Sequence, residues 1–308
     1  MRRVDLSKKI YIKPGIEPLL KEVDALIFDV DGVLLDVHRS FWDVILITTR
    51  KYLSLKNIRS PFKPLKKHIK LLKLSGGFNN DWDVTSALIL ISLCYSSGYF
   101  FEISELSYEI YKRGGGLQNL EAILKEKIGD KFCELLSLLE RPLVERLFKE
   151  IYAGKDTFQV YGFEPVYISP SWEGLYKRET VLLSPDDIPP SIRKMGLFTG
   201  RTAGETRLAL TMTGFISCIP MEFVITADDG LNKPAPEMLK CLAERMKAKR
   251  AIYVGDAIDD LRSVPQEDSS ILSCIVNKGQ QSFFKREGAD IIVPETRMLT
   301  NLLREERI

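Results

Sequence analysis

The hydrophobic and polar positions of this 308-residue chain change pattern twice along its length. A short continuous apolar run at residues 25–28, directly after Asp24, is typical of a buried strand. From about residue 38 to 155, apolar residues recur at the spacing of amphipathic helices, and few strand-like runs appear. One predicted helical face consists of Phe41, Ile45, Thr48 and Tyr52. From about residue 184 onward, short apolar runs alternate with helical stretches, so the pattern predicts two different kinds of structure.

The last part of the chain predicts a parallel sheet. Strands are expected at residues 196–199, 223–225, 251–254, 271–276 and 289–293, with helices through Leu210, at 235–247 and at 298–303. Strands that alternate with helices indicate a doubly wound α/β fold, to which the strand at 24–31 also belongs. We therefore expect a discontinuous core of residues 1–36 and 184–308. Residues 37–183 are expected to form an inserted helical domain, which ends in an irregular return linker from about residue 155.

Composition narrows the classes of protein that fit. Hydrophobic residues make up 45% and charged residues 28%, as in soluble globular proteins. The net charge of +2 offers no strong field for nucleic acid or a membrane surface. Serines and a glycine interrupt the most apolar stretch, residues 85–101, which therefore predicts a core helix. Five dispersed cysteines without a CxxC spacing, and a start without a signal-peptide pattern, predict a cytoplasmic protein.

Two carboxylates and a glycine follow the first apolar run. Side chains alternate along a strand, so Asp29 and Asp31 would share a face if it continued, whereas Gly32 predicts a sharp turn. Two acids at the end of a buried strand are costly unless a cation shares the pocket. This stretch therefore indicates either a divalent-metal site with one acid as a nucleophile, or a strand followed by an ordinary acidic turn.

Polar residues also follow the later strands, where ligands bind in such a sheet. They are Thr199, Gly200 and Arg201 after the second strand, Asp228, Asp229 and Lys233 after the third, and Asp256, Asp259 and Asp260 after the fourth. Carboxylates with few other ligand types select Mg²⁺. A hydroxyl, a lysine and backbone N–H groups around the same point suit the oxygens of a phosphoryl group. Asp228 and Asp229 are most simply part of a solvated loop.

Four short motifs of the sequence resemble those of a known protein family. They are Asp-Val-Asp-Gly-Val-Leu (29–34), Phe-Thr-Gly-Arg (198–201), Lys-Pro-Ala-Pro-Glu (233–237) and Gly-Asp-Ala-Ile-Asp-Asp (255–260). In order and spacing they resemble the motifs of the haloacid dehalogenase (HAD) superfamily of phosphohydrolases. The insertion after the first motif is similar to that superfamily's helical cap. The stretch Gly-Gly-Phe-Asn-Asn-Asp-Trp-Asp (76–83) also looks like a smaller branch of the phosphoglycolate-phosphatase-like subfamily. The resemblance implies a Rossmann-like core with an α-helical cap.

The resemblance also implies roles for single residues. Asp29 would attack phosphorus to form an aspartyl-phosphate, and Asp31 would protonate the leaving alcohol and later activate water. Phosphoryl oxygens would be held by Gly32, Thr199, Gly200 and Lys233, and Lys233 would also neutralise charge on the nucleophile. The predicted Mg²⁺ ligands are Asp29, Asp31 through its carbonyl, Asp256 and Asp260, the last of which would alternatively orient a metal-bound water.

Asp31 also bears on the reaction class. Dehalogenases of the superfamily lack an acid at that position, so Asp31 favours phosphate-ester chemistry on a small phosphorylated metabolite. The substrate itself is not predicted, because the core motifs touch only its phosphate. One alternative is a sugar phosphomutase with the same Asp29 and Asp31, and another is a non-catalytic phospho-ligand-binding protein. A monomer or a homodimer fits the sequence equally well.

The helical region contributes weaker candidates. Asn79 and Asn80 are candidates to face a substrate. Alternatively, Asn80 or Asp81 caps the next helix, and Asp81 is the expected cap. Arg113, beside Gly114–Gly116, either reaches a phosphate or is a solvated helix end. The two histidines, His38 and His68, are expected to be structural, with substrate sensing as the alternative for His38.

Overall fold

The computed structural model describes residues 10–78, 80–265 and 268–305. Its chain forms two compact units, one of residues 1–36 and 180–308 and the other of residues 37–179. We call the first the α/β unit and the second the helical unit, and each is described by itself.

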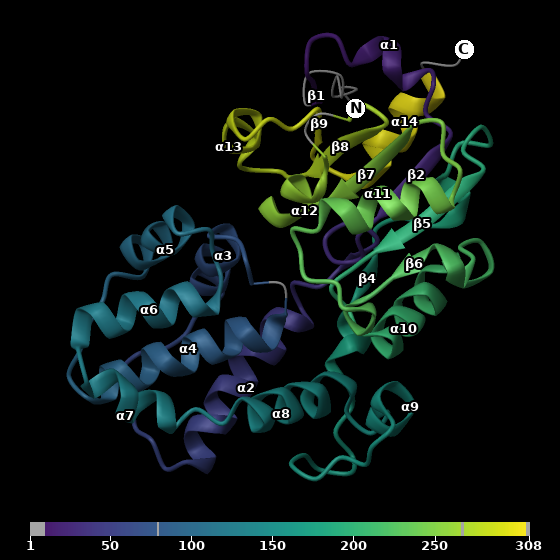
Figure 1. Cartoon of the computed structure of the whole chain (residues 1–308). Coiled ribbons are helices and arrows are strands. Elements are labelled where there is room, and N and C mark those ends of the chain that lie inside the picture. Colours follow the sequence, from purple (N-terminus) through teal and green to yellow (C-terminus); the bar gives the residue numbers. More distant parts are fainter. Residues whose placement is uncertain (1–9, 79, 266–267, 306–308) are drawn as a thin grey trace, which may run out of the picture. The chain divides into compact units, whose positions relative to one another are not determined.

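The α/β unit is built on a seven-stranded sheet with the strand order β1-β9-β8-β7-β2-β5-β6 (Figure 1). All neighbouring strands are parallel except β1, which pairs antiparallel with β9 at the edge. The seven strands are β1 (Tyr11–Ile12), β2 (Ala25–Phe28), β5 (Lys194–Phe198), β6 (Val224–Ile225), β7 (Ala251–Gly255), β8 (Ile271–Val276) and β9 (Ile291–Val293). A two-stranded ribbon, β3 (Leu35–Asp36) with β4 (Thr180–Val181), completes the strands. The predicted doubly wound sheet is confirmed, and the N-terminal strand β1 adds one antiparallel strand at its edge.

Helices follow most strands of this unit. They are α1 (Glu17–Leu20), α10 (Ala203–Thr213), α11 (Pro236–Arg245), α12 (Ile258–Ser263), α13 (Gln281–Arg286) and α14 (Thr296–Glu305). Short 3-10 helices lie at Pro185–Asp187, Phe215–Ser217, Met221–Phe223 and Ala227–Asp229. The hydrophobic pattern did not predict α12 and α13, because six residues are too few for a helical period to register.

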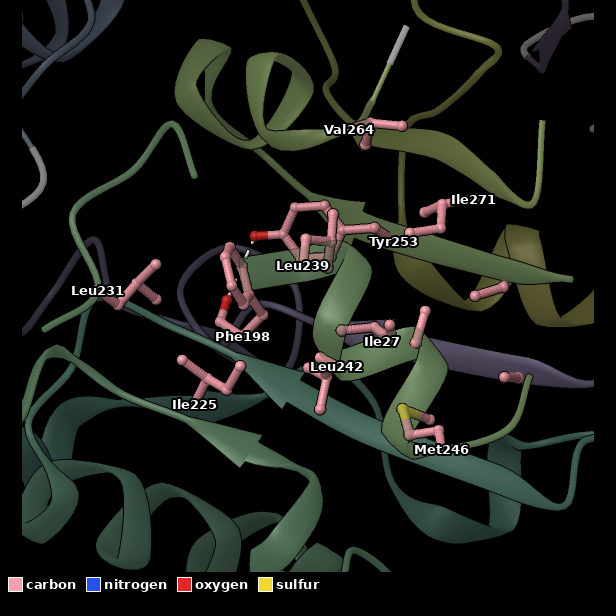
Figure 2. Close-up of a cluster of buried hydrophobic side chains, with 13 residues drawn as sticks. Ile27, Phe198, Ile225, Leu231, Leu239, Leu242, Met246, Tyr253, Val264 and Ile271 are labelled. Atoms are coloured by element: carbon pink, nitrogen blue, oxygen red, sulfur yellow. Dashed lines mark hydrogen bonds between the residues drawn. The ribbon is translucent and has the colours of Figure 1, made fainter. Parts of the chain in front are cut away.

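The core of this unit lies on both faces of the sheet. On one face, Leu239 and Leu242 of α11 pack over Ile27 of β2 and its neighbours on adjacent strands (Figure 2). Phe28 points to the opposite side of the pleat, where its ring lies 5.9 Å from that of Phe215. Strand β2 is therefore buried on both faces, as its unbroken apolar run predicted.

The helical unit contains α2 (Phe41–Leu55), α3 (Lys66–Leu74), α4 (Asp81–Ser96), α5 (Ile103–Lys112), α6 (Leu117–Ile128), α7 (Lys131–Ser137), α8 (Arg141–Ala153) and α9 (Thr157–Tyr161), and a 3-10 helix at Leu175–Arg178. The predicted apolar face of α2 is buried from Phe41 to Tyr52. Helix α4 is central, packs on α2, α6, α7 and α8, and is buried from Val84 to Cys94. The prediction of a core helix is thus confirmed, and none of the helices in the described residues is long and apolar enough to cross a membrane.

Two glycine-bearing stretches of the sequence meet in this unit. The N–H of Gly116 donates to the carbonyl of Gly76 at 2.8 Å, and both glycines have positive φ. A Cβ on Gly115 would lie 2.3 Å from the Gly76 carbonyl oxygen, so the two backbones touch. Glycine is therefore required in this crossing by both conformation and space.

Candidate active site

The candidate site gathers at the carboxyl ends of neighbouring strands in the α/β unit. Asp29 directly follows β2, and its N–H donates to the carbonyl of Val254 on β7 at 2.9 Å. Thr199 follows β5, and its N–H donates to Ile225 on β6 at 3.0 Å. Both residues therefore extend the sheet ladder by one position, which fixes their backbones, and both side chains are buried.

Lys233 joins two of the predicted carboxylates. Its Nζ lies 2.8 Å from Oδ1 of Asp260 and 3.3 Å from Oδ1 of Asp29. Only 7% of the side chain is exposed, so solvent screens these ion pairs weakly. The predicted contact of this lysine with the nucleophile position is present in the structure.

The surroundings of Asp29 disfavour its charge. Burial is the largest cause and raises the pKa of Asp29 to about 6. Lys233 opposes this rise, whereas the neighbouring carboxylates of Asp260 and Asp31 add to it. Burial acts against the Lys233 charge as well, but Asp260 and Asp29 outweigh it and raise the pKa of that ammonium. The site therefore holds a Lys233 ammonium that stays charged. Beside it lies the Asp29 carboxylate, whose negative charge is only partly offset.

Asp260 is in a different state, because both of its oxygens are saturated. Oδ1 accepts from Lys233 at 2.8 Å and from the Tyr253 hydroxyl at 2.6 Å. Oδ2 accepts from the N–H groups of Asp256 and Ala257, each at 3.0 Å, at the start of α12. Although burial raises the pKa of Asp260, Lys233 outweighs burial and holds that pKa below its usual range. These bonds favour an orienting role over direct ligation of a metal.

The carboxylates nevertheless fit a hard divalent cation. Asp29, Asp256 and Asp260 each offer an oxygen within 4.8 Å of the others. In the described part of the chain, the buried Oδ1 of Asp29 makes no hydrogen bond, although Lys233 lies near it. An all-carboxylate donor set with one oxygen lacking a hydrogen bond is what Mg²⁺ prefers. Asp29 and Asp256 are the residues best able to hold that ion.

Gly32 has a spatial role that differs from its predicted one. It has φ of +72°, and a Cβ there would lie 2.2 Å from Oδ2 of Asp256. Its N–H donates to the carbonyl of Leu35 at 2.8 Å, so this amide is not available to a phosphate. The phosphate-binding prediction for Gly32 is therefore corrected: the glycine makes room for the Asp256 carboxylate. By contrast, no partner for the N–H of Gly200 is found among the described residues.

Asp31 is held by a residue to which the sequence assigned no role. Oδ1 of Asp31 accepts from Arg201 Nε at 2.8 Å and lies 2.7 Å from Arg201 Nη2. Arg201 is 3% exposed, and its N–H also lies 3.3 Å from Thr199 Oγ1. The signal was its place directly after Thr-Gly at a strand end, opposite two acids.

The predicted site residues of the helical unit either have partners within that unit or lie outside the described residues. Asn79 lies outside the described residues. Asn80, not Asp81, occupies the N-cap position of α4, because Asp81 is already helical and pairs with Lys73 at 2.8 Å. Arg113 makes a two-pronged ion pair with Glu126, with both contacts at 2.7 Å, on the exposed end of α5.

That pairing agrees with the alternative for Arg113, a solvated helix end, and its phosphate-binding role stays a prediction. Of the histidines, His68 has a structural contact, because its Nδ1 accepts from the N–H of Leu65 at 3.1 Å. The exposed ring of His38 lies 4.4 Å from that of Trp42.

Comparisons with known proteins bear on the fold of the chain. No family model matches the chain. Imidazoleglycerol-phosphate dehydratase of Phytophthora nicotianae is 26% identical over 242 residues, which are 78% of this chain and 40% of that protein, so the chain spans less than half of that relative's length.

Among solved structures, phosphatase Tt82 of Thermococcus thioreducens has a TM-score of 0.61 and 25% identity, and covers 91% of this chain and 99% of its own. A Lactobacillus delbrueckii subsp. bulgaricus structure, named provisionally a phosphoglycolate phosphatase, has a TM-score of 0.54 at 18% identity, covers 92% and 98%, and shows the fold alone. The chain therefore shares its fold with a phosphatase over nine-tenths of both chains, and its four ordered motifs at the strand ends resemble those of the haloacid dehalogenase superfamily.

Proposed function

We propose that this chain is a Mg²⁺-dependent phosphohydrolase that releases phosphate from a small phosphorylated metabolite through an aspartyl-phosphate on Asp29. One observation carries the proposal: the Lys233 ammonium lies between the Asp29 and Asp260 carboxylates at the end of β2, and Oδ1 of Asp29 makes no hydrogen bond within the described residues. A phospho-ligand sensor would need the lysine, but it would not need a buried carboxylate of raised free energy facing the phosphate.

The first step transfers the phosphoryl group to the protein. An Asp29 carboxylate oxygen attacks phosphorus, the bond from phosphorus to the substrate oxygen breaks, and Asp31 gives its proton to the leaving alcohol. Lys233 and Thr199 hold phosphoryl oxygens during the transfer. Arg201 holds the Asp31 carboxylate in place through its two contacts.

The second step returns the protein to its starting state. Asp31, now a carboxylate, takes a proton from water, and the oxygen of that water attacks phosphorus. The bond between phosphorus and the Asp29 oxygen breaks, which releases inorganic phosphate and restores both acids. Mg²⁺ held by Asp29 and Asp256 would offset the negative charge of the phosphoryl oxygens in both steps.

The substrate test is a panel of phosphate monoesters with phosphate release as the readout. The panel includes an aryl phosphate, phosphoglycolate, imidazoleglycerol phosphate because of the named relative, and a sugar 1-phosphate with and without its bisphosphate. We expect hydrolysis that EDTA removes and Mg²⁺ restores, and that is lost in Asp29→Asn. Turnover that is unaffected by the chelator or by Asp29→Asn contradicts the proposal, and isomerisation that requires the bisphosphate would identify a mutase instead.

A further inference from the structure

Tyr253 is a buried tyrosine in the central strand β7, and the steps above do not use it. It is 1% exposed and lies in the hydrophobic cluster beneath α11, beside Phe198 (Figure 2). The other residues at its level of the sheet, Ile27 and Ser273, come from the neighbouring strands β2 and β8. A buried phenol must find a hydrogen-bond partner, so an aliphatic residue would pack here at lower cost.

The hydroxyl of Tyr253 contacts the candidate active site through Asp260. Its oxygen lies 2.6 Å from Oδ1 of Asp260 and 3.3 Å from the carbonyl oxygen of Phe198. A hydroxyl has one proton to donate, and the shorter contact to a carboxylate receives it. Burial, and after it the charge of Asp260, raises the pKa of Tyr253, which keeps the proton on this oxygen.

That bond acts on the oxygen that also holds the catalytic lysine. Oδ1 of Asp260 accepts from both Tyr253 and Lys233, while Asp29 pulls on the same ammonium from 3.3 Å. Each donor to Oδ1 takes part of its charge, so the phenol weakens the attraction of Asp260 for the lysine. Asp260 then holds the ammonium less tightly, and Asp29 and a phosphoryl group bound there compete for it more effectively.

The rings confine Lys233 as well. The rings of Phe198 and Tyr253 meet edge to face, with centroids 5.5 Å apart and planes at 88°. Lys233 Nζ lies 5.5 Å from the first centroid and 5.6 Å from the second. An ammonium is attracted to aromatic faces at this range, so the two rings limit where it can move.

We propose that Tyr253 is a positioning residue: its hydroxyl fixes the Asp260 carboxylate, and its ring with that of Phe198 confines Lys233, so that the lysine is aimed at Asp29. This inference rests on the proposed function. It adds a role for a strand residue that the proposed steps do not use.

Tyr253→Phe removes only the hydroxyl, and Tyr52→Phe is the matched control. Tyr52 is a fully buried tyrosine of the helical unit whose hydroxyl also has two bonds, one to the Leu138 carbonyl and one from the Glu140 N–H, both at 2.7 Å. With an aryl phosphate and saturating Mg²⁺, we expect Tyr253→Phe to lower kcat about tenfold with little change in KM. Tyr52→Phe should lower the melting temperature and leave kcat unchanged.

A double-variant cycle separates positioning from general destabilisation. If Tyr253 acts through Asp260, adding Tyr253→Phe to Asp260→Asn should lower kcat no further. A kcat near that of the wild type in Tyr253→Phe, or a full further tenfold loss in the double variant, overturns the proposal. A Tyr253→Phe protein that fails to fold, while Tyr52→Phe folds, also overturns it, because the hydroxyl would then be structural.

Crystal structures distinguish this failure from failure of the proposed function. If the wild type hydrolyses no phosphate ester, the proposed function is wrong, but the position of Lys233 can still be compared between wild type and Tyr253→Phe. We expect Lys233 Nζ to move toward Asp260 and away from Asp29 in the variant. An unchanged lysine overturns the positioning role whatever the activity.

Discussion

Replacing the proposed nucleophile should abolish activity and also stabilise the protein. In Asp29→Asn the side chain keeps its size and loses its charge. The wild-type carboxylate is buried, and its Oδ1 makes no hydrogen bond in the described part of the chain. Removing a charge that the folded protein disfavours should raise the free energy of unfolding.

The size of the gain follows from the pKa of Asp29. Burial raises this pKa from 3.8 to about 6, so the native state holds the proton more tightly than the unfolded chain. Ionisation therefore costs nothing below about pH 3.8, costs progressively more between the two pKa values, and reaches about 3 kcal/mol above pH 6. Asp29→Asn does not have this cost. Its free energy of unfolding should therefore exceed that of the wild type by about 3 kcal/mol at neutral pH and by under about 1 kcal/mol near pH 4.

The assay is thermal unfolding in EDTA at several pH values. At about pH 7.5 we expect a melting temperature roughly 5–10 °C above that of the wild type, and the difference should vanish in acid. Asp24→Asn is the matched control, because Asp24 accepts from Lys194 at 2.7 Å and from the Lys249 and Arg250 N–H groups.

Although burial raises the pKa of Asp24, its hydrogen bonds from Lys194 and the backbone outweigh burial and lower that pKa. Its ionised form is therefore stabilising above the unfolded pKa, and Asp24→Asn should destabilise the protein at neutral pH and leave turnover intact. Equal or lower stability of Asp29→Asn at every pH would refute the reasoning.

Three further outcomes follow from other parts of the molecule. Gly115→Ala should lower the free energy of unfolding, measured in urea, by about 3 kcal/mol, and Gly114→Ala by only about 1 kcal/mol. Both glycines have positive φ, but only a Cβ on Gly115 would meet the Gly76 carbonyl. Equal losses would contradict the backbone contact. Mg²⁺ affinity measured by calorimetry should fall about fourfold from pH 7.5 to 5.5, because protons compete for Asp29, and a flat profile would remove Asp29 from the metal site. Arg113→Ala should leave kcat/KM for an aryl phosphate within about twofold of the wild type, and a larger loss would support its phosphate role.

The fold was predictable where the hydrophobic pattern was long and regular. The buried run of β2 and the period of α2 and α4 each extend over enough residues to distinguish strand from helix. The edge strand β1 was not predictable, because two residues carry no period and its pairing with β9 joins distant parts of the chain. The contact between Gly76 and Gly116 was not predictable either, because each glycine-bearing stretch alone indicates only a loop.

The site was predictable as a set of residues but not as a network of bonds. Strand ends of a parallel sheet lie together, so Asp29, Lys233 and Asp260 could be grouped before their distances were known. Which oxygen accepts from which donor depends on loop conformation, and no spacing reveals it. The predicted amide of Gly32 was wrong for this reason, because its N–H is used to close the turn with Leu35.

The two buried acids beside Lys233 show why such bonds decide function. Asp260 receives four hydrogen bonds, and its pKa is lowered, so it serves as a fixed anchor. Asp29 lies near the same lysine, but its Oδ1 receives no hydrogen bond within the described residues, and its pKa is raised. A buried carboxylate with an oxygen that receives no hydrogen bond gains most from a metal ion or a bond to phosphorus. The difference in bonding between these two acids, rather than their proximity, is therefore the reason why we propose Asp29 as the reactive residue.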